Sequence, residues 1–408
     1  MTGTPGARSP IPRLRAGGGV AALGYGFRPF FLLAGISAAL GIALWLADLA
    51  QWMSLPGIFA PVTWHAHEML FGFTMAAVGG FFLTAIPNWT GRLPLSGQPL
   101  LGLVLVWLAG RLAISASALI GGWAAAAIDL AFPAALMLVV VREVAAGRNW
   151  RNLPMAAAVG LLLVANALMH AEALGLAILP GSGWRLAVAV VTVLIALIGG
   201  RIIPSFTRNW LVKRGVGEAG LPVPFGRFDM ATLAVTAAGL LSWVASPGSS
   251  VAVVLTAAAA ILCAVRLFRW QGRRTTADPL VFILHLGWAW VPIGLGLLAI
   301  AQAAPAVLPE IAALHALTAG AIGTMILAVM TRATLGHTGR ALHAGAGTVV
   351  VYLLVSIAAV ARVAAGFLPE AYDGLLWLSG LAWLAAFTGF VAIYGPYLLR
   401  PRPDGKPG

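Results

Sequence analysis

Long apolar runs separated by short polar gaps dominate the chain. A helix that crosses the hydrocarbon core of a bilayer needs about 20 consecutive, mostly apolar residues. Twelve stretches meet this requirement, and charged residues lie mostly in the gaps between them. The predicted spans cover residues 30–50, 64–87, 99–120, 122–142, 152–173, 183–203, 229–246, 250–270, 279–302, 309–332, 347–366 and 374–398. The pattern predicts an all-α fold, a polytopic transmembrane helical bundle of about 12 spans.

The same pattern divides the chain into three parts. We expect an N-terminal tail over residues 1–29, a single transmembrane domain over residues 30–398, and a C-terminal tail over residues 399–408. The N-terminal tail is rich in arginine, glycine and proline, and it has no short apolar core that ends in a cleavage site. It is therefore predicted to be a cytoplasmic tail and not a signal peptide.

Arginine and lysine predict the orientation of the bundle. They gather in both tails and in the even-numbered loops, whereas the odd-numbered loops have almost none. In membrane proteins the short cytoplasmic loops carry the excess of basic residues. The alternation therefore predicts an even number of spans, with both termini in the cytoplasm.

The composition supports a membrane protein and excludes several other classes. Hydrophobic residues make up 61% of the chain and charged residues 9%, whereas an ordinary soluble domain has about 25% charged residues. The lipid bilayer is the expected partner. The net charge of +13 can indicate nucleic-acid binding, but here the basic residues lie in loops between spans, so no nucleic-acid partner is expected. The single cysteine, Cys263, excludes an intrachain disulfide framework or a cysteine-rich metal site.

The histidines gather at one predicted depth. Histidine inside a bilayer is costly and is a functional hypothesis by default. His65 and His67 open the second span, His315 lies early in the tenth, and His170 lies near the end of the fifth, which runs outward. All four are therefore expected near the outer face of the membrane. His285 lies in the inner half of the ninth span.

Two imidazoles from two helices at matched depth are suited to hold a haem iron. His67 and His315 meet this requirement, so we predict that they bind a haem between the second and tenth spans. His65, His170 and His285 are candidate metal ligands, and copper is one possible metal because it accepts imidazole nitrogen. The alternative is that each histidine only forms a hydrogen bond with a carbonyl group or water at the membrane interface.

Two buried charges and two interfacial carboxylates accompany the histidines. Arg111 and Asp129 lie at similar depth in the third and fourth spans, and we expect them to pair because an unpaired charge there is costly. Arg111 is then either structural or an anchor for a haem propionate or a substrate anion. Glu68 and Glu172 flank the histidines. Each is predicted either to accept the second ring N–H of a ligand histidine or to lie in interfacial water.

The second and tenth spans share a weak internal repeat. His67 and His315 are each followed, 25 residues later, by the arginine of a Thr-Gly-Arg motif, and each has a glycine five residues after it. A third phrase, residues 203–207 at the predicted cytoplasmic end of the sixth span, is similar to residues 86–90. The two interpretations are helices with equivalent roles or coincidence among glycine- and alanine-rich helices.

Several phrases of the sequence, in order along nearly the whole chain, carry a family resemblance. They are Gly24-Tyr25-Gly26-Phe27-Arg28-Pro29-Phe30-Phe31, His65-Ala66-His67-Glu68-Met69, Pro87-Asn88-Trp89-Thr90-Gly91-Arg92, Gly200-Arg201 through Asn209, and His315-Ala316 through Gly336-His337-Thr338-Gly339-Arg340. The chain resembles the NnrS family. This resemblance implies a protein of the bacterial inner membrane that contains haem and copper and is linked to nitric oxide metabolism and nitrosative stress. It does not supply the ligands.

The favoured hypothesis is a haem- and copper-containing membrane protein that acts in nitric oxide metabolism or resistance, with a b-type haem near the periplasmic face. Whether it is an enzyme with haem-dependent redox activity on nitric oxide or nitrosyl species is open, because a haem held by two histidines has no vacant position for nitric oxide. A redox partner is not identified by the sequence. One alternative is a secondary transporter of a small solute, since internal repeats are common in such proteins. Another is a non-catalytic haem or nitric oxide sensor, or a metal-assembly factor.

Overall fold

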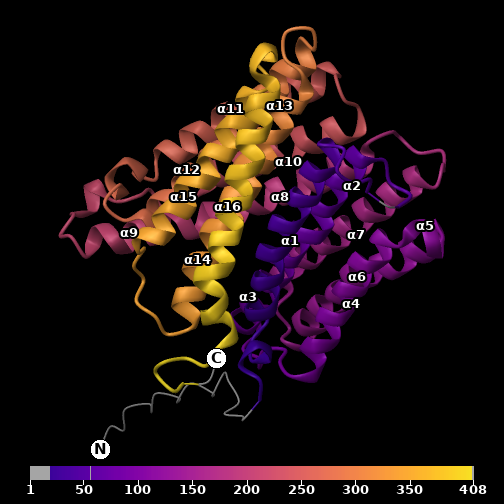
Figure 1. Ribbon diagram of the computed structural model, residues 1–408. Coiled ribbons are helices and arrows are strands. Elements are labelled where there is room, and N and C mark those ends of the chain that lie inside the picture. Colours follow the sequence, from indigo (N-terminus) through magenta and orange to yellow (C-terminus); the bar gives the residue numbers. More distant parts are fainter. Residues whose placement is uncertain (1–18, 56, 407–408) are drawn as a thin grey trace, which may run out of the picture.

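Twelve long helices form a bundle in the computed structural model, which describes residues 19–55 and 57–406 (Figure 1). All twelve are long and apolar enough to cross a membrane. No β-strand occurs in the described part of the chain. The predicted all-α, polytopic bundle is therefore confirmed.

The helices follow one another through the bundle with short connections. The first six spans are α1 (Phe27–Leu49); α2 (Pro61–His67) with η2 (Glu68–Thr74) and α3 (Met75–Thr90); α4 (Gln98–Ser115); α6 (Gly122–Ala146); α7 (Leu153–Ala173); and α8 (Ser182–Leu194) with η4 (Ile195–Gly199) and α9 (Gly200–Val212). The last six spans are α10 (Arg227–Ala245), α11 (Ser250–Phe268), α12 (Pro279–Ala303), α13 (Glu310–His315) with η7 (Ala316–Gly323) and α14 (Thr324–His337), α15 (Ala346–Ala364), and α16 (Tyr372–Leu399).

The third span is shorter than predicted. A single helix was expected over residues 99–120, but α4 ends at Ser115 and a separate turn, α5 (Ser117–Ile120), follows it. The hydroxyl of Ser117 donates to the carbonyl of Ile114 (2.7 Å) and accepts the N–H of Ile58 (3.0 Å). This buried side chain therefore links the end of the helix to the preceding outer loop.

The second, sixth and tenth spans form the centre of the bundle. Their most apolar windows are 78%, 72% and 67% buried, the highest values among the twelve spans. Each contains a π-helical segment, namely η2, η4 and η7. Such segments are rare and are frequent at functional sites. The three central spans are therefore the first place to look for function.

The π-helical segment of the sixth span is stabilised by side chains from neighbouring helices. Arg266 of α11 donates to the carbonyl of Ala196 (2.8 Å), and Trp288 of α12 donates to the carbonyl of Ile195 (3.3 Å). The charge of Arg266 is compensated by Asp229, with Nε 2.7 Å from Oδ1. Both charged groups are buried, and pairing is the usual arrangement for charges at this depth.

The internal repeat of the second and tenth spans is also present in the structure. In both spans the histidine, His67 or His315, is the last residue before the π-helical segment. At the other end, the hydroxyls of Thr90 and Thr338 each donate to the carbonyl four residues earlier. The glycine that follows each threonine has φ +70°. The two spans therefore share the position of the histidine, a π-helical segment directly after it, and the way the helix ends.

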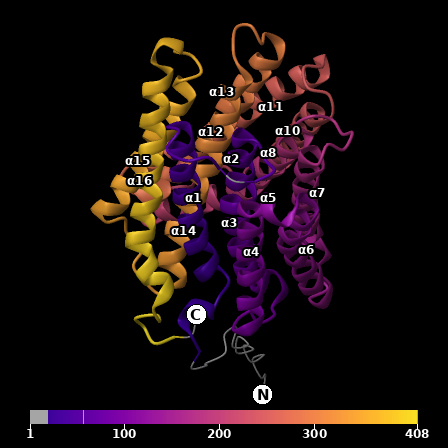
Figure 2. The same ribbon diagram turned by 45° about the vertical axis from the view of Figure 1, so that its right-hand side comes forward.

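The beginning of α1 and the end of α16 lie side by side at one end of the bundle (Figures 1 and 2). Arg28 donates to the carbonyls of Leu398 (3.0 Å) and Arg400 (2.8 Å). Carbonyl groups at the end of a helix have no partner within the helix, so Arg28 caps α16. Because the first and last spans begin and finish at the same end of the bundle, the number of spans is even, as the sequence predicted. Residues 1–18 and 407–408 of the predicted tails lie outside the described residues.

Candidate metal centre

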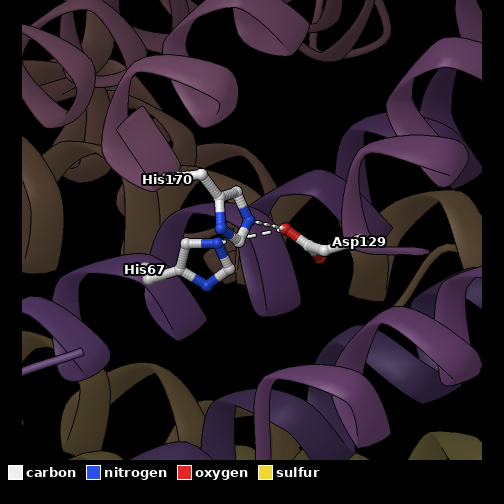
Figure 3. Close-up of side chains that lie close together, drawn as sticks. All are labelled: His67, Asp129 and His170. Atoms are coloured by element: carbon white, nitrogen blue, oxygen red, sulfur yellow. Dashed lines mark hydrogen bonds and ion pairs between the residues drawn. The ribbon is translucent and has the colours of Figure 1, made fainter. Parts of the chain in front are cut away.

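Three buried side chains converge beside α2 (Figure 3), which lies in the half of the bundle away from the chain ends (Figure 1). His67 ends α2, Asp129 lies within α6, and His170 lies in the last turn of α7. Oδ2 of Asp129 is 3.1 Å from Nε2 of His67 and 3.0 Å from Nε2 of His170. The exposed fractions of the three residues are 0%, 1% and 2%. We call these three residues the triad.

Asn166 joins the triad from the same helix as His170. Its Nδ2 donates to Oδ2 of Asp129 (2.8 Å), and its Oδ1 is 2.9 Å from Nε2 of His67. Asn166 and His170 are four residues apart, so α7 presents both on one face. The polar side chains are thus brought together by helix periodicity as well as by helix packing.

Arg111 of α4 pairs with both carboxylates that surround His67. It contacts Oδ1 of Asp129, and its Nη1 is 2.5 Å from Oε1 of Glu68. The predicted Arg111–Asp129 pair is therefore present. Oε1 of Glu68 also lies 3.2 Å from Nδ1 of His67. Glu68 thus contacts a histidine ring, which is one of the two placements that the sequence left open for it.

The charges of this group do not cancel when both histidines are neutral. Glu68 and Asp129 are acidic, and Arg111 is the one permanently charged base in contact with them among the described residues. A buried net charge is costly. A proton on His67 or a bound monovalent ion such as Cu⁺ would neutralise the net charge of −1, and a divalent ion would change it to +1.

The geometry of the triad fits a transition metal. Two ligand atoms that each lie about 2.1 Å from one metal ion are separated by 3.0 to 3.1 Å when the angle between them is near 95°. Oδ2 of Asp129 shows this separation from both imidazole nitrogens, and without a metal the same contacts are hydrogen bonds. Glu68 would hold the second ring nitrogen of His67, as carboxylates commonly do for metal-bound histidines.

His315 and His65 belong to a separate group. Nδ1 of His315 donates to the carbonyl of Ile311 (2.8 Å), and the His65 ring stacks on Trp45 with 4.9 Å between centroids. Both histidines interact electrostatically with Arg362 of α15, and with each other. Within the described residues, His315 takes part in none of the hydrogen bonds or ion pairs of the triad.

The two remaining candidates lie apart from the triad. Oε2 of Glu172 accepts the N–H of Gly181 (2.9 Å) and so fixes an outer loop. Nε2 of His285 is 2.8 Å from the hydroxyl of Thr207. His285 lies within the second turn of α12.

Three residues of these two groups had no such role in the sequence analysis. Asp129 was expected only as the partner of Arg111, and Asn166 and Arg362 were not singled out. A signal for Asn166 exists, because an amide four residues before His170 on an apolar helix shares its face. Arg362 lies near the outer end of its span, where an arginine is hard to distinguish from an interfacial anchor.

The chain matches the family described as NnrS protein over residues 21–402. No curated protein matches it. The matched region includes all twelve spans and every residue of the triad. The chain therefore belongs to the NnrS family, and this membership indicates a multi-pass membrane protein related to nitric oxide.

Proposed function

We propose that the chain is a metalloprotein of the bacterial inner membrane that binds or transforms nitric oxide. The observation that carries this proposal is the triad: three buried ligand atoms on three helices, in a part of the bundle where uncompensated polar groups are costly. Family membership supplies the connection with nitric oxide. The concentration of basic residues in alternate loops supports an orientation in the inner membrane that places the triad toward the periplasm.

Copper is the metal that we propose for the triad. Imidazole nitrogen is suited to copper, iron and zinc, and a set of two histidines with one carboxylate also binds ferrous iron in other proteins. The family resemblance favours copper among these. In each case Arg111 holds the second oxygen of Asp129, and Glu68 orients His67 by accepting the proton on its Nδ1.

A haem is proposed beside His315. Donation from its Nδ1 to Ile311 leaves Nε2 as the nitrogen for a metal. Nδ1 of His65 and one guanidinium nitrogen of Arg362 are buried without a hydrogen-bond partner, so a haem iron and a haem propionate would complete them. A haem supplies an iron at which nitric oxide binds or an electron is exchanged.

In this proposal His67 is a ligand of the triad and His65 accompanies His315 at the haem. The sequence analysis gave these two histidines the opposite roles. The sequence analysis paired His67 with His315 around a haem and placed Arg111 near a propionate. Both ring nitrogens of His67 contact Glu68, Asp129 or Asn166, and the guanidinium of Arg111 contacts two carboxylates. These contacts favour the triad as the place of His67, and they leave His65 as the histidine that accompanies His315.

Metal analysis and absorption spectra of the purified protein and three variants test the assignment. We expect His170→Ala to lose the copper and keep the haem bands. His315→Ala should lose or broaden the haem bands and keep the copper. Glu172→Gln is the matched control, since Glu172 contacts a loop near His170 and should change neither. Copper retained in full by His170→Ala would refute the triad as its site.

A further inference from the structure

An apolar crevice lies between the second, sixth and tenth spans. All of its fifteen lining residues are glycine, alanine, aliphatic, phenylalanine or methionine. Apart from Phe31 of α1, they fall within residues 77–82, 191–202 and 325–330. Each of these ranges belongs to the later part of a span that runs from the predicted outer face to the inner face. The crevice therefore occupies the inner half of the bundle.

The crevice is open to its surroundings. Seven of the lining residues are partly exposed, and they come from all three spans, as Val78, Ile198 and Val329 illustrate. Water in the crevice would remain in contact with these apolar side chains, which is unfavourable. An ion or a polar solute would gain no hydrogen bond from them. The expected occupant is therefore a hydrocarbon chain.

The length of the crevice matches one leaflet of a bilayer. Its wall on the sixth span extends from Val191 to Ile202. Eleven residues at a rise of about 1.5 Å correspond to about 16 Å. Half of a hydrocarbon core of about 30 Å is about 15 Å. An acyl chain of the inner leaflet is therefore long enough to fill the crevice.

An arginine lies at the inner end of the crevice. Arg332 follows the lining residue Val329 by three positions, so both lie on one side of α14. The guanidinium carbon of Arg332 lies 4.1 Å from the centre of the Phe206 ring. Phe206 in turn follows the lining residue Ile202 by one turn of α9. Two walls of the crevice thus lead to Arg332.

Arg332 also lies at the depth of lipid headgroups. The tenth span begins at Glu310, which is 22 residues earlier, or about 33 Å along a helix. The hydrocarbon core is about 30 Å thick. The guanidinium is therefore expected at the inner boundary of this core, where the phosphates of the inner leaflet lie.

The protein compensates the charge of Arg332 only in part. Arg332 interacts electrostatically with Asp278, but within the described residues it forms no hydrogen bond or ion pair. The Asp278 carboxylate instead accepts the N–H of Leu280 (3.0 Å). Arg111 and Arg266, by contrast, each form an ion pair with an aspartate. The N–H groups of Arg332 are thus free to donate to a phosphate, which arginine binds well.

We propose that the crevice binds an anionic phospholipid of the inner leaflet, with one acyl chain between the three spans and the phosphate at Arg332. Basic sites between membrane-spanning helices on the cytoplasmic side bind such headgroups in other proteins. The π-helical segments η2 and η7 both contact α8, so the three spans meet in the outer half of the bundle. The lipid chain fills the space between their inner halves and holds them at a fixed separation.

Native mass spectrometry of the delipidated full-length protein tests the headgroup site. The wild type should bind one phosphatidylglycerol more tightly than phosphatidylethanolamine. Arg332→Gln should weaken phosphatidylglycerol binding by about fivefold, the effect of one arginine near an anionic surface. Arg273→Gln is the matched control, because Arg273 lies over the ring of Phe268 on α11, which does not line the crevice. This control should bind phosphatidylglycerol as the wild type does.

A second pair of variants tests the acyl chain. Val329→Trp fills the crevice from its open side and should abolish the tight binding of phosphatidylglycerol. Val254→Trp is its control, since Val254 is 64% exposed on α11, and it should leave lipid binding unchanged. If Val329→Trp does not fold, glycerol phosphate without acyl chains is added to the wild type as a competitor, and it should not displace the lipid.

Several results would overturn the proposal. They are equal binding of the two lipids by the wild type, an effect of Arg332→Gln no larger than that of Arg273→Gln, or tight binding that Val329→Trp retains. Displacement of the lipid by glycerol phosphate would show a phosphate site without a chain in the crevice. The metal content of the protein does not enter these measurements, so the lipid site and the proposed function stand or fall separately.

Discussion

His67 and His315 occupy the same position in two repeated spans, yet their surroundings differ completely. Each is the last residue before a π-helical segment. His67 is fully buried; its Nε2 contacts Asp129 and Asn166 of other helices, and its Nδ1 contacts the adjacent Glu68. Nδ1 of His315 donates to a carbonyl of its own helix, and its charged neighbour is Arg362.

The difference comes from the helices that pack around each span. The span of His67 faces α4, α6 and α7, which supply an arginine, an aspartate, an asparagine and a histidine. The residue after His67 is Glu68, whereas the residue after His315 is Ala316. The acidic surroundings of His67 favour a cation. The basic surroundings of His315, where one imidazole nitrogen has no hydrogen-bond partner among the described residues, favour an anionic cofactor. A repeated backbone can therefore hold two sites of opposite charge preference.

The largest effect is expected from Asp129→Ala. This variant leaves Arg111 and Glu68 in place and removes the residue that contacts His67, His170 and Arg111 together. Removing one partner of a buried ion pair typically costs about 3–5 kcal/mol. We expect a loss of that size in the free energy of unfolding, measured in detergent by denaturant titration.

A His315→Ala variant and a double variant show how much of that loss in unfolding free energy comes from the broken ion pair. His315 pairs with no carboxylate among the described residues, so His315→Ala should cost clearly less than Asp129→Ala. Combining Asp129→Leu with Arg111→Met removes both charges and should restore part of the stability. Equal losses in Asp129→Ala and His315→Ala would show that the two histidine environments do not differ in energy as proposed.

A smaller effect is expected from Glu68→Gln. The amide keeps an oxygen near Nδ1 of His67 but removes the negative charge that Arg111 and His67 share. Changes to groups that orient a metal-bound histidine typically cost about 10–100-fold in metal affinity. Competition with a copper chelator should show a weaker copper site while the haem bands stay unchanged. An unchanged copper affinity would mean that Glu68 does not support the metal.

The glycines that end the second and tenth spans have more similar surroundings than the two histidines. We therefore expect a smaller difference in stability between substitutions at these glycines. Gly91 and Gly339 both have φ +70°, a conformation that costs other residues about 1–2 kcal/mol. A Cβ atom on Gly91 would meet no atom within 4 Å, whereas one on Gly339 would lie 3.0 Å from Arg402 and Asp404. Gly339→Ala should therefore destabilise the protein more than Gly91→Ala. The order of their thermal midpoints measures this, and the reverse order would contradict it.

The sequence predicted most of the fold because a bilayer imposes a simple rule. Each span must satisfy its own backbone polar groups, so apolar length identifies helices well. The pairing of Arg111 with Asp129 was predictable for the same reason, since the cost of an isolated charge limits the alternatives. Depth along each helix also brought His67 and His170 to one level correctly.

Rotation about the helix axis was the missing information. His65 and His67 lie at nearly the same depth but point to different neighbours, Trp45 in one case and Asp129 in the other. Depth alone cannot distinguish them. Nor could it show that Glu172 binds the N–H of a loop glycine and not a histidine ring. The rotation depends on packing between distant spans, which a single sequence does not specify.

The smallest effect is expected outside the membrane, where water screens charges. Arg402 donates to the carbonyl of His337 (2.9 Å) and pairs with Asp404, with Nη2 2.6 Å from Oδ2. This pairing lowers the pKa of the exposed Asp404 carboxyl. A carboxyl whose pKa is lowered by folding stabilises the protein above its unfolded pKa, about 4, and this contribution is lost as the pH falls through the folded value.

Asp404→Asn should therefore reduce the thermal midpoint slightly at neutral pH, and the difference from the wild type should shrink as the solution becomes strongly acidic. The wild type and the variant are compared by thermal unfolding across the acidic range. A difference that grows toward low pH would contradict the sign of this linkage. The contrast with Asp129 then isolates the effect of burial, because each aspartate pairs with an arginine. Breaking the buried pair leaves a desolvated charge without a partner, whereas water screens the charge left by the exposed pair. Only the buried pair is therefore expected to contribute strongly to stability.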